Sequence, residues 1–200
     1  MRNAEATRER ILKAALAEFS AHGIAGARVD RIAQIAGCNK NLIYIYFEDK
    51  ETLFTTVLRK HFMRIHEEQP FTPDDLPGYA AKVFDWALAN PDLMRLLAWF
   101  ALEHKASGPA ERVAMFNAKI AALTEAQKAG HVGTAFPPDF LVTAILNLAT
   151  AWSVASPFGP SLDPKATERP AELRKSLIEA VRLLANAGKG TRTQRRGKLR

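Results

Sequence analysis

The chain has 200 residues, of which 48% are hydrophobic and 24% charged, and its formal net charge at pH 7 is +7. This apolar content excludes a disordered chain, and the length suits one larger or two smaller domains with a real core. No apolar run approaches the roughly 20 residues that a membrane-spanning helix needs, and charged residues interrupt the N-terminus, so we predict neither a membrane span nor a secretory signal.

The N-terminal third predicts helices that end at recognisable residues. A first helix is expected over residues 4–21, before Gly23, with a buried stripe of Ile11, Leu12, Ala15, Leu16 and Phe19. A second buried stripe follows the i, i+3, i+4, i+7 pattern at Val29, Ile32, Ala33 and Ala36. Gly37 supplies the left-handed conformation that ends this helix, and Asn39 can accept a backbone N–H and begin the next. Residues 28–47 therefore predict a helix-turn-helix, whose second helix is suited to a DNA major groove.

The rest of the chain also predicts helices and no convincing strand. A long helix from Asp49 is expected to connect both halves, and the polar segment 67–77, which contains prolines, is the predicted domain boundary. Further helices are predicted over 78–90, 91–107 and 109–130, then from Pro138 and from Pro170, with a loop at 157–164. The predicted fold is all-α: a three-helix helix-turn-helix DNA-binding domain (4–64), a larger helical bundle for ligand binding and dimerisation (72–187) and a basic disordered tail (188–200).

The helix that begins at Pro138 is apolar on nearly every side. Such a helix is buried within its own subunit or against a partner. Because a helix-turn-helix that binds palindromic DNA needs a twofold dimer, we predict a homodimer through this helix and the one that begins at Pro170. The alternative is a central helix in a monomeric bundle.

The positive charge lies mainly at the end of the chain. Residues 1–68 carry 11 Lys and Arg against 9 Asp and Glu, residues 69–188 carry 11 against 12, and the tail Lys189–Arg200 carries six basic residues and no acid. A basic arm would add salt-sensitive affinity for DNA with little sequence preference. The alternative is a solvated terminus without a specific role.

The run TRERILKAALAEFSAHGIAGARVDRIAQIAGCNKNLIYIYFEDKETLF resembles the N-terminal domain of the tetracycline-repressor (TetR) family. Its most specific part is IYIYF followed by Lys50 and Glu51, and the resemblance covers about residues 4–64. It implies a sequence-specific, ligand-responsive transcriptional regulator, more often a repressor, that acts as a homodimer on double-stranded DNA with a palindromic operator. The C-terminal half resembles the family only in length and number of helices.

The resemblance also implies which residues contact DNA. Lys40 and Asn41 are placed to contact base edges, and Tyr44, one turn later, to touch a phosphate or a thymine methyl group. Contacts to the DNA backbone are expected from the residues that flank them: Arg28, Asn39, Tyr46 and Lys50. For the two tyrosines, the alternative is that they only brace the small domain.

Two positions depart from the family pattern. Asn41 stands where many relatives have glycine, and Ile45 fills a position that is often polar or basic. An exposed Ile45 could meet thymine methyl groups. Alternatively, it packs against the first helix and contacts no base.

The resemblance further implies a ligand pocket among the helices of the second domain. The candidate lining residues are aromatic, sulfur-containing or polar: His61, Phe84, Met94, Trp99, His104, Met115, Phe116, Asn147 and Trp152. Such residues at helical spacing also suit a core. Asn147, on an apolar helix, is expected to need a buried partner, which could be a ligand, its counterpart across the dimer or a neighbouring backbone carbonyl. Because the domain is nearly neutral and has no acidic cluster, we predict a small hydrophobic or aromatic effector in preference to a polycation.

No catalytic, metal or cofactor site is predicted. Cys38 is the single cysteine, which favours a reducing cytoplasm, and its place in the turn favours structural burial. His61 and His66 are not at a metal-ligand spacing with the acids that follow, and no glycine-rich phosphate loop or nucleophile elbow is present. The alternative functions are a nonspecific DNA-binding protein driven by the basic tail, and a helical enzyme or carrier with a vestigial DNA-binding domain.

Overall fold

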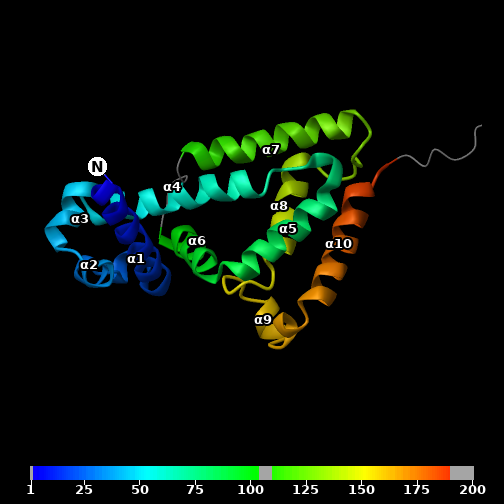
Figure 1. Ribbon diagram of the computed structural model, residues 1–200. Helices are drawn as coiled ribbons and strands as arrows, with labels where there is room; N and C mark the ends of the chain where they lie inside the picture. Colours follow the sequence, from blue (N-terminus) through cyan, green and yellow to red (C-terminus); the bar gives the residue numbers. More distant parts are fainter. Residues whose placement is uncertain (1, 104–109, 190–200) are drawn as a thin grey trace, which may run out of the picture.

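The computed structural model describes residues 2–103 and 110–189, and over these ranges it contains only helices and loops (Figure 1). The first elements are α1 (Arg2–Gly26), α2 (Val29–Ala36), α3 (Lys40–Phe47), α4 (Lys50–Glu68), η1 (Pro73–Asp75) and α5 (Leu76–Ala89). The remaining elements are α6 (Pro91–Glu103), α7 (Ala110–Lys128), α8 (Pro138–Thr150), α9 (Gly159–Leu162), η2 (Ala166–Glu168) and α10 (Pro170–Asn186). The predicted all-α fold is confirmed. None of the described helices is long and apolar enough to cross a membrane.

The turn between α2 and α3 forms as its residues predict. Gly37 adopts a left-handed conformation (φ 62°, ψ 44°) and donates its N–H to the carbonyl of Gln34. Asn39 has extended backbone angles, and its side-chain oxygen accepts the N–H of Asn41 at 2.9 Å. These two caps fix the end of α2 and the start of α3.

Two hydrophobic cores divide the molecule. The first joins α1–α4 to α6, and it contains Phe19, Phe54 and Phe100 in a row, with ring centroids 5.1 and 6.5 Å apart. The second joins α5, α7, α8 and α10 at the other end of the molecule (Figure 1). The core near the helix-turn-helix therefore includes α6, a helix from the C-terminal half of the fold.

The first helix is longer than predicted. It continues to Gly26 through a kink at Gly23, where φ is 66° and ψ −177°. A Cβ at Gly23 would lie 2.3 Å from Oε1 of Glu103 and 2.9 Å from the ring of Trp99, both on α6. Glu103 accepts the N–H of Ile24 at 2.8 Å, so α6 caps the segment that follows the kink. Gly23 alone predicts the end of this helix, but in the structure the contact with Glu103, distant in the sequence, holds the segment beyond Gly23 in place.

Two further predictions about the C-terminal half differ from the structure. The expected loop at 157–164 contains the short helix α9. Asn147 is exposed and donates its amide to the carbonyl of Thr143 at 2.9 Å. The expected burial of this amide is wrong, whereas its partner is a neighbouring backbone carbonyl, one of the three alternatives that the sequence left open. The buried side of α8 packs against α5, α7 and α10 of the same chain.

Candidate nucleic-acid interface and ligand cavity

The outer side of α3 presents four side chains in two helical rows. Lys40 and Tyr44 are four residues apart, as are Asn41 and Ile45, so each pair shares one face of the helix. Ile45 is 75% exposed, while Ile43 and Phe47 on the opposite side are buried in the first core. Ile45 therefore does not pack against α1, and the outer side of α3 combines cationic, amide, phenolic and aliphatic groups.

Lys40 is paired in the free protein. Its Nζ lies 3.0 Å from Oδ2 and 2.9 Å from Oδ1 of Asp30 on α2. The hydrogen bond to Asp30 raises the pKa of Lys40 above its usual 10.5. Lys40 therefore stays protonated at neutral pH, and a contact to DNA would require it to leave or share Asp30.

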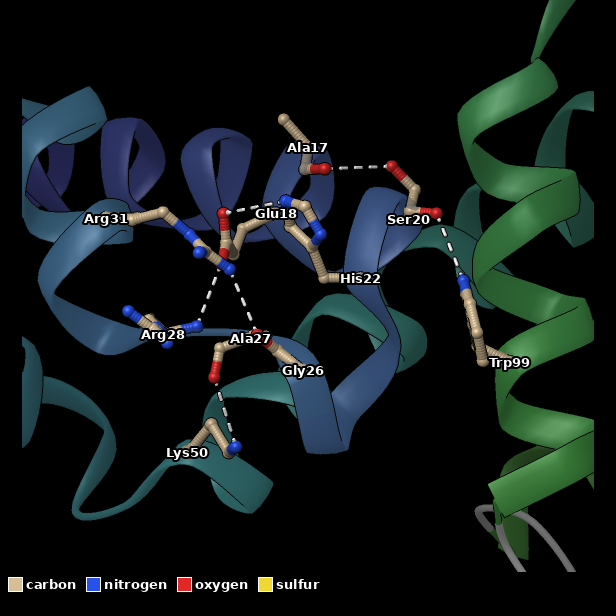
Figure 2. A network of polar contacts seen from close by, with 10 residues as sticks. All are labelled: Ala17, Glu18, Ser20, His22, Gly26, Ala27, Arg28, Arg31, Lys50 and Trp99. Carbon is tan, nitrogen blue, oxygen red and sulfur yellow. Dashed lines mark hydrogen bonds and ion pairs between the residues drawn. The ribbon is translucent and has the colours of Figure 1, made fainter.

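A buried carboxylate holds the start of α2 (Figure 2). Glu18 is 4% exposed and accepts the backbone N–H of Arg28 at 2.8 Å and Nε of Arg31 at 2.7 Å. Burial alone would raise the pKa of Glu18, but the hydrogen bonds from Arg31 and Arg28 outweigh burial and lower it below 4.5. Sequence reasoning missed Glu18 and Arg31, because they lie on different helices and form no local motif.

The predicted contacts to the DNA backbone lie on both sides of α3. Lys50 donates to the carbonyl of Ala27 at 3.2 Å, which brings it next to the exposed Arg28 at the start of α2 (Figure 2). Asn39 is exposed at the turn and caps α3. Tyr46 is half-buried against the first core, with its ring centroid 6.1 Å from that of Phe47. The exposed candidates are therefore Arg28 and Asn39, while Tyr46 and Lys50 are half-buried.

A separate cavity of about 270 Å³ lies among helices α4 to α8. Most of its lining is apolar or aromatic: Phe62, Tyr79, Val83, Trp86, Met94, Leu97, Met115, Phe116 and Leu146. The remaining lining residues carry polar or charged groups: Gln69, Arg112, Lys119, Asn147 and Thr150. Four of the predicted pocket residues are among them, namely Met94, Met115, Phe116 and Asn147.

The other predicted pocket residues lie elsewhere. Phe84 is buried in the second core, and His61 lines a small hollow beside Leu93 and Leu96, where burial lowers its pKa. Trp99 donates its Nε1–H to the carbonyl of Ser20 at 3.2 Å (Figure 2). Trp152 lines a different hollow, and His104 lies outside the described residues.

Two cationic side chains of α7, Arg112 and Lys119, line the cavity. Lys119 is 7% exposed, and its Nζ lies 5.2 Å from the ring centroid of Phe71 and 5.1 Å from that of Tyr79. Arg112 lies over three rings, with its Cζ 5.0 to 5.7 Å from their centroids: Phe62, Phe100 and Phe116. Burial lowers the pKa of both groups. Sequence reasoning missed them, although the seven-residue spacing on one helix face was available as a signal.

The single cysteine of the chain lies in the turn between α2 and α3. Cys38 is partly buried against the first core. Over residues 2–103 and 110–189, no group of three or more His, Cys, Asp or Glu side chains is arranged to hold a metal ion.

Comparisons with known proteins match both halves of the chain. Residues 11–57 match the family described as "Bacterial regulatory proteins, tetR family", and residues 75–182 match "Tetracyclin repressor-like, C-terminal domain". The chain is 42% identical over 162 residues to the HTH-type transcriptional repressor SCO4008 of Streptomyces coelicolor, covering 78% of this chain and 82% of that protein. It is 33% identical over 102 residues to the HTH-type transcriptional repressor NicS of Pseudomonas putida, covering 48% of each.

A solved structure shares the arrangement of both halves. The putative transcriptional regulator SCO4942 from Streptomyces coelicolor superposes with a TM-score of 0.78 at 37% sequence identity, covering 88% of this chain and 96% of that one. The similarity therefore extends over the helix-turn-helix and the cavity-bearing helices together.

Proposed function

The chain belongs to the tetR family of bacterial regulatory proteins and is a DNA-binding transcriptional regulator, and from this premise we propose that it is a ligand-responsive repressor that binds a palindromic operator as a homodimer. The observation that carries the proposal is the outer side of α3, where Lys40, Asn41, Tyr44 and Ile45 lie together beside the anchored start of α2. Repression is proposed because SCO4008 and NicS are both described as repressors.

Each DNA contact has a proposed role that suits its chemistry. Lys40 and Asn41 would contact base edges, since lysine suits guanine acceptors and asparagine pairs with adenine. Ile45 would meet a thymine methyl group, with Tyr44 touching a neighbouring methyl group or phosphate. The residues around α3 would hold the DNA backbone: Arg28, Asn39, Tyr46 and Lys50.

The homodimer would form through α8 and α10. In Figure 1, α10 lies at the end of the molecule opposite α3, so pairing there leaves both recognition helices free. In the DNA-bound state the two α3 helices would lie about one helical turn apart, near 35 Å. A basic tail beyond residue 188 would add affinity without sequence preference.

Ligand binding in the cavity would change the separation of the two α3 helices through α4. This helix begins beside α3 at Lys50 and carries Phe62, which lines the cavity. A row of contacts supports the same route: Arg112 lies over Phe100, which stacks on Phe54, which packs on Phe19 of α1. The ligand would act through its different affinities for the two states.

Selection of bound DNA from a random duplex pool at near-physiological salt tests this function. We expect the wild type to select a palindromic consensus, and Lys40→Ala combined with Tyr44→Ala to lose it. Lys128→Ala, an exposed change at the end of α7, should select the wild-type sequence. The contrary result is DNA binding that yields no consensus, weakens as the salt concentration rises and is lost when residues 189–200 are deleted. That result would indicate a nonspecific DNA-binding protein.

A further inference from the structure

The cavity among helices α4 to α8 is lined by positive charge that no carboxylate of the described lining balances. Lys119 is almost fully buried, and Arg112 lies among aromatic rings, so both have lost much of their hydration. Burial of a cation without a counter-charge is costly, and proteins normally pair such groups with a carboxylate. Among the residues that line this cavity in the described chain, none is Asp or Glu.

Within the described ranges, no acidic side chain pairs with either of the two cations, Arg112 and Lys119. The neighbouring carboxylate of Glu111 is paired with Arg59 at 3.3 Å. The segments outside the described ranges, residues 1, 104–109 and 190–200, contain no Asp or Glu in the sequence.

Aromatic rings hold the cations but leave hydrogen-bonding groups unsatisfied. The contacts with Phe71 and Tyr79, for Lys119, and with the rings around Arg112 are attractive, yet a ring face does not replace a hydrogen-bond acceptor. Nε of Arg112 and Oε1 of Gln69 are both buried without a hydrogen-bond partner. Unsatisfied buried polar atoms are uncommon in native proteins, and here two of them belong to residues that line one cavity.

We propose that this cavity binds a small organic anion, whose acidic group lies between Lys119 and Arg112 and whose apolar body packs among the aromatic and methionine side chains. The volume of about 270 Å³ is near the lower limit for small-molecule pockets, so the body should be one or two rings or a short alkyl chain. The proposed ligand differs from the hydrophobic or aromatic effector predicted from the sequence in that it also carries a negative charge. Its regulatory meaning rests on the proposed ligand-responsive repressor, whereas its binding does not.

Calorimetric titration of the full-length protein with matched probes tests the charge preference. The probes are 2-naphthoate, the neutral 2-naphthamide and the cationic 2-naphthylmethylammonium, with benzoate and octanoate as smaller and aliphatic carboxylates. We expect at least one carboxylate to bind, and 2-naphthoate to bind at least tenfold more tightly than the amide and the ammonium. Failure of all three carboxylates to bind, or equal affinity for naphthoate and naphthamide, would overturn the proposal.

Variants of the two cations identify the site. Lys119→Met and Arg112→Met replace each cation with a shorter, unbranched apolar side chain. Each should weaken the binding of 2-naphthoate at least tenfold while changing that of the amide less than about threefold. Lys128→Met makes the same change at an exposed position of the same helix and should bind like the wild type. Circular dichroism establishes that each variant folds. Retention of naphthoate binding in both cavity variants would place the anion elsewhere and refute the assignment.

Operator binding, measured on the same proteins, separates this inference from the proposed function. If 2-naphthoate binds through Lys119 and Arg112 but leaves operator affinity unchanged, the anion site stands and the ligand-responsive mechanism fails. If the protein selects an operator but binds none of the carboxylates, the DNA-binding function stands and the anion site fails.

Discussion

Glu18 and Lys119 are buried charges and Arg112 is a half-buried one, and the environment of Glu18 is opposite to that of the two cations. Glu18 has a cationic partner and a backbone donor, whereas Lys119 and Arg112 have aromatic rings and no described carboxylate. A paired buried charge fixes local structure and is costly to disrupt, while an unpaired one lowers stability until a counter-ion binds. We therefore expect substitution of Glu18 to weaken the fold and substitution of Lys119 to strengthen it.

Glu18→Gln should reduce stability at neutral pH but have less effect in acid. Because the folded state lowers the pKa of Glu18 below 4.5, its contribution is fully present above that pH and disappears as the pH falls through the folded-state pKa. We expect the free energy of unfolding to fall by about 1–3 kcal/mol at pH 7. Urea unfolding at pH 7 and pH 3.5 measures the difference between the two proteins.

The exposed Glu5 on the same helix provides the control, since Glu5→Gln should leave the unfolding free energy nearly unchanged at both pH values. A deficit in Glu18→Gln that is equally large at pH 3.5 would contradict this account, because it would not depend on ionisation of the carboxylate.

Lys119→Met should stabilise the ligand-free protein. Replacing the buried ammonium with an unbranched apolar side chain should raise the free energy of unfolding by about 1–3 kcal/mol at pH 7. Because burial lowers the pKa of Lys119 below its usual 10.5, wild-type stability should also rise as the pH approaches 10.5, and this rise should be smaller in the variant. Chemical unfolding at pH 7 and pH 9.5 measures both effects.

Lys128→Met is again the control, and it should change the free energy of unfolding by no more than about 0.5 kcal/mol. A loss of stability in Lys119→Met would mean that the contacts of the ammonium with the rings of Phe71 and Tyr79 outweigh the cost of its burial.

At the scale of the elements, local signals predicted the helix-turn-helix closely. Gly37 and Asn39 act on their own neighbours, so α2 and α3 could be placed from the sequence. The cavity was predicted less completely, because Arg112 and Lys119 were not among its candidate lining residues. Arg112 and Lys119 instead share an inward face with Met115 and Phe116. Which face of a helix is buried depends on its neighbours, and only the folded structure establishes these.

Gly23→Ala should disrupt the contact between α1 and α6. Gly23 has φ 66°, which alanine adopts at a cost, and the added Cβ would lie 2.3 Å from Oε1 of Glu103. We expect a loss of about 2–3 kcal/mol in the free energy of unfolding. Urea unfolding followed by circular dichroism measures it.

Gly26→Ala is the matched control three residues later. A Cβ at Gly26 meets no atom closer than 3.4 Å, so the same substitution there should be nearly neutral or slightly stabilising. Equal destabilisation by both variants would indicate a general effect on α1 in place of a specific contact with α6.

At the scale of the whole molecule, α6 connects the cavity to the DNA-binding helices. Met94 and Leu97 line the cavity. One to two turns later, Trp99 donates a hydrogen bond to α1 and Glu103 accepts one from it. Figure 1 shows α6 between α1 and α5. A ligand that moves α6 would therefore act on α1 as well as on α4, and the two recognition helices of a dimer would move with them.

Leu183→Glu should convert the proposed dimer into a monomer. Leu183 is 66% exposed on α10, and Phe140 on α8 is also exposed, so both would be buried if these helices pair. A carboxylate placed in such an interface is costly to desolvate, and we expect the dimer dissociation constant to rise roughly 100-fold, equivalent to about 3 kcal/mol. Light scattering coupled to size-exclusion chromatography measures the mass, and the variant should also lose affinity for a palindromic operator more than for a half-site.

Leu102→Glu supplies the comparison, because Leu102 is 78% exposed on α6, away from the proposed interface. This variant should remain dimeric, and Phe140→Glu should dissociate as Leu183→Glu does. If both α8 and α10 variants stay dimeric while Leu102→Glu becomes monomeric, the subunits pair through the other end of the helical bundle. That arrangement would bring the twofold axis close to α6, and the separation of the two α3 helices would then depend directly on the contact between α6 and α1.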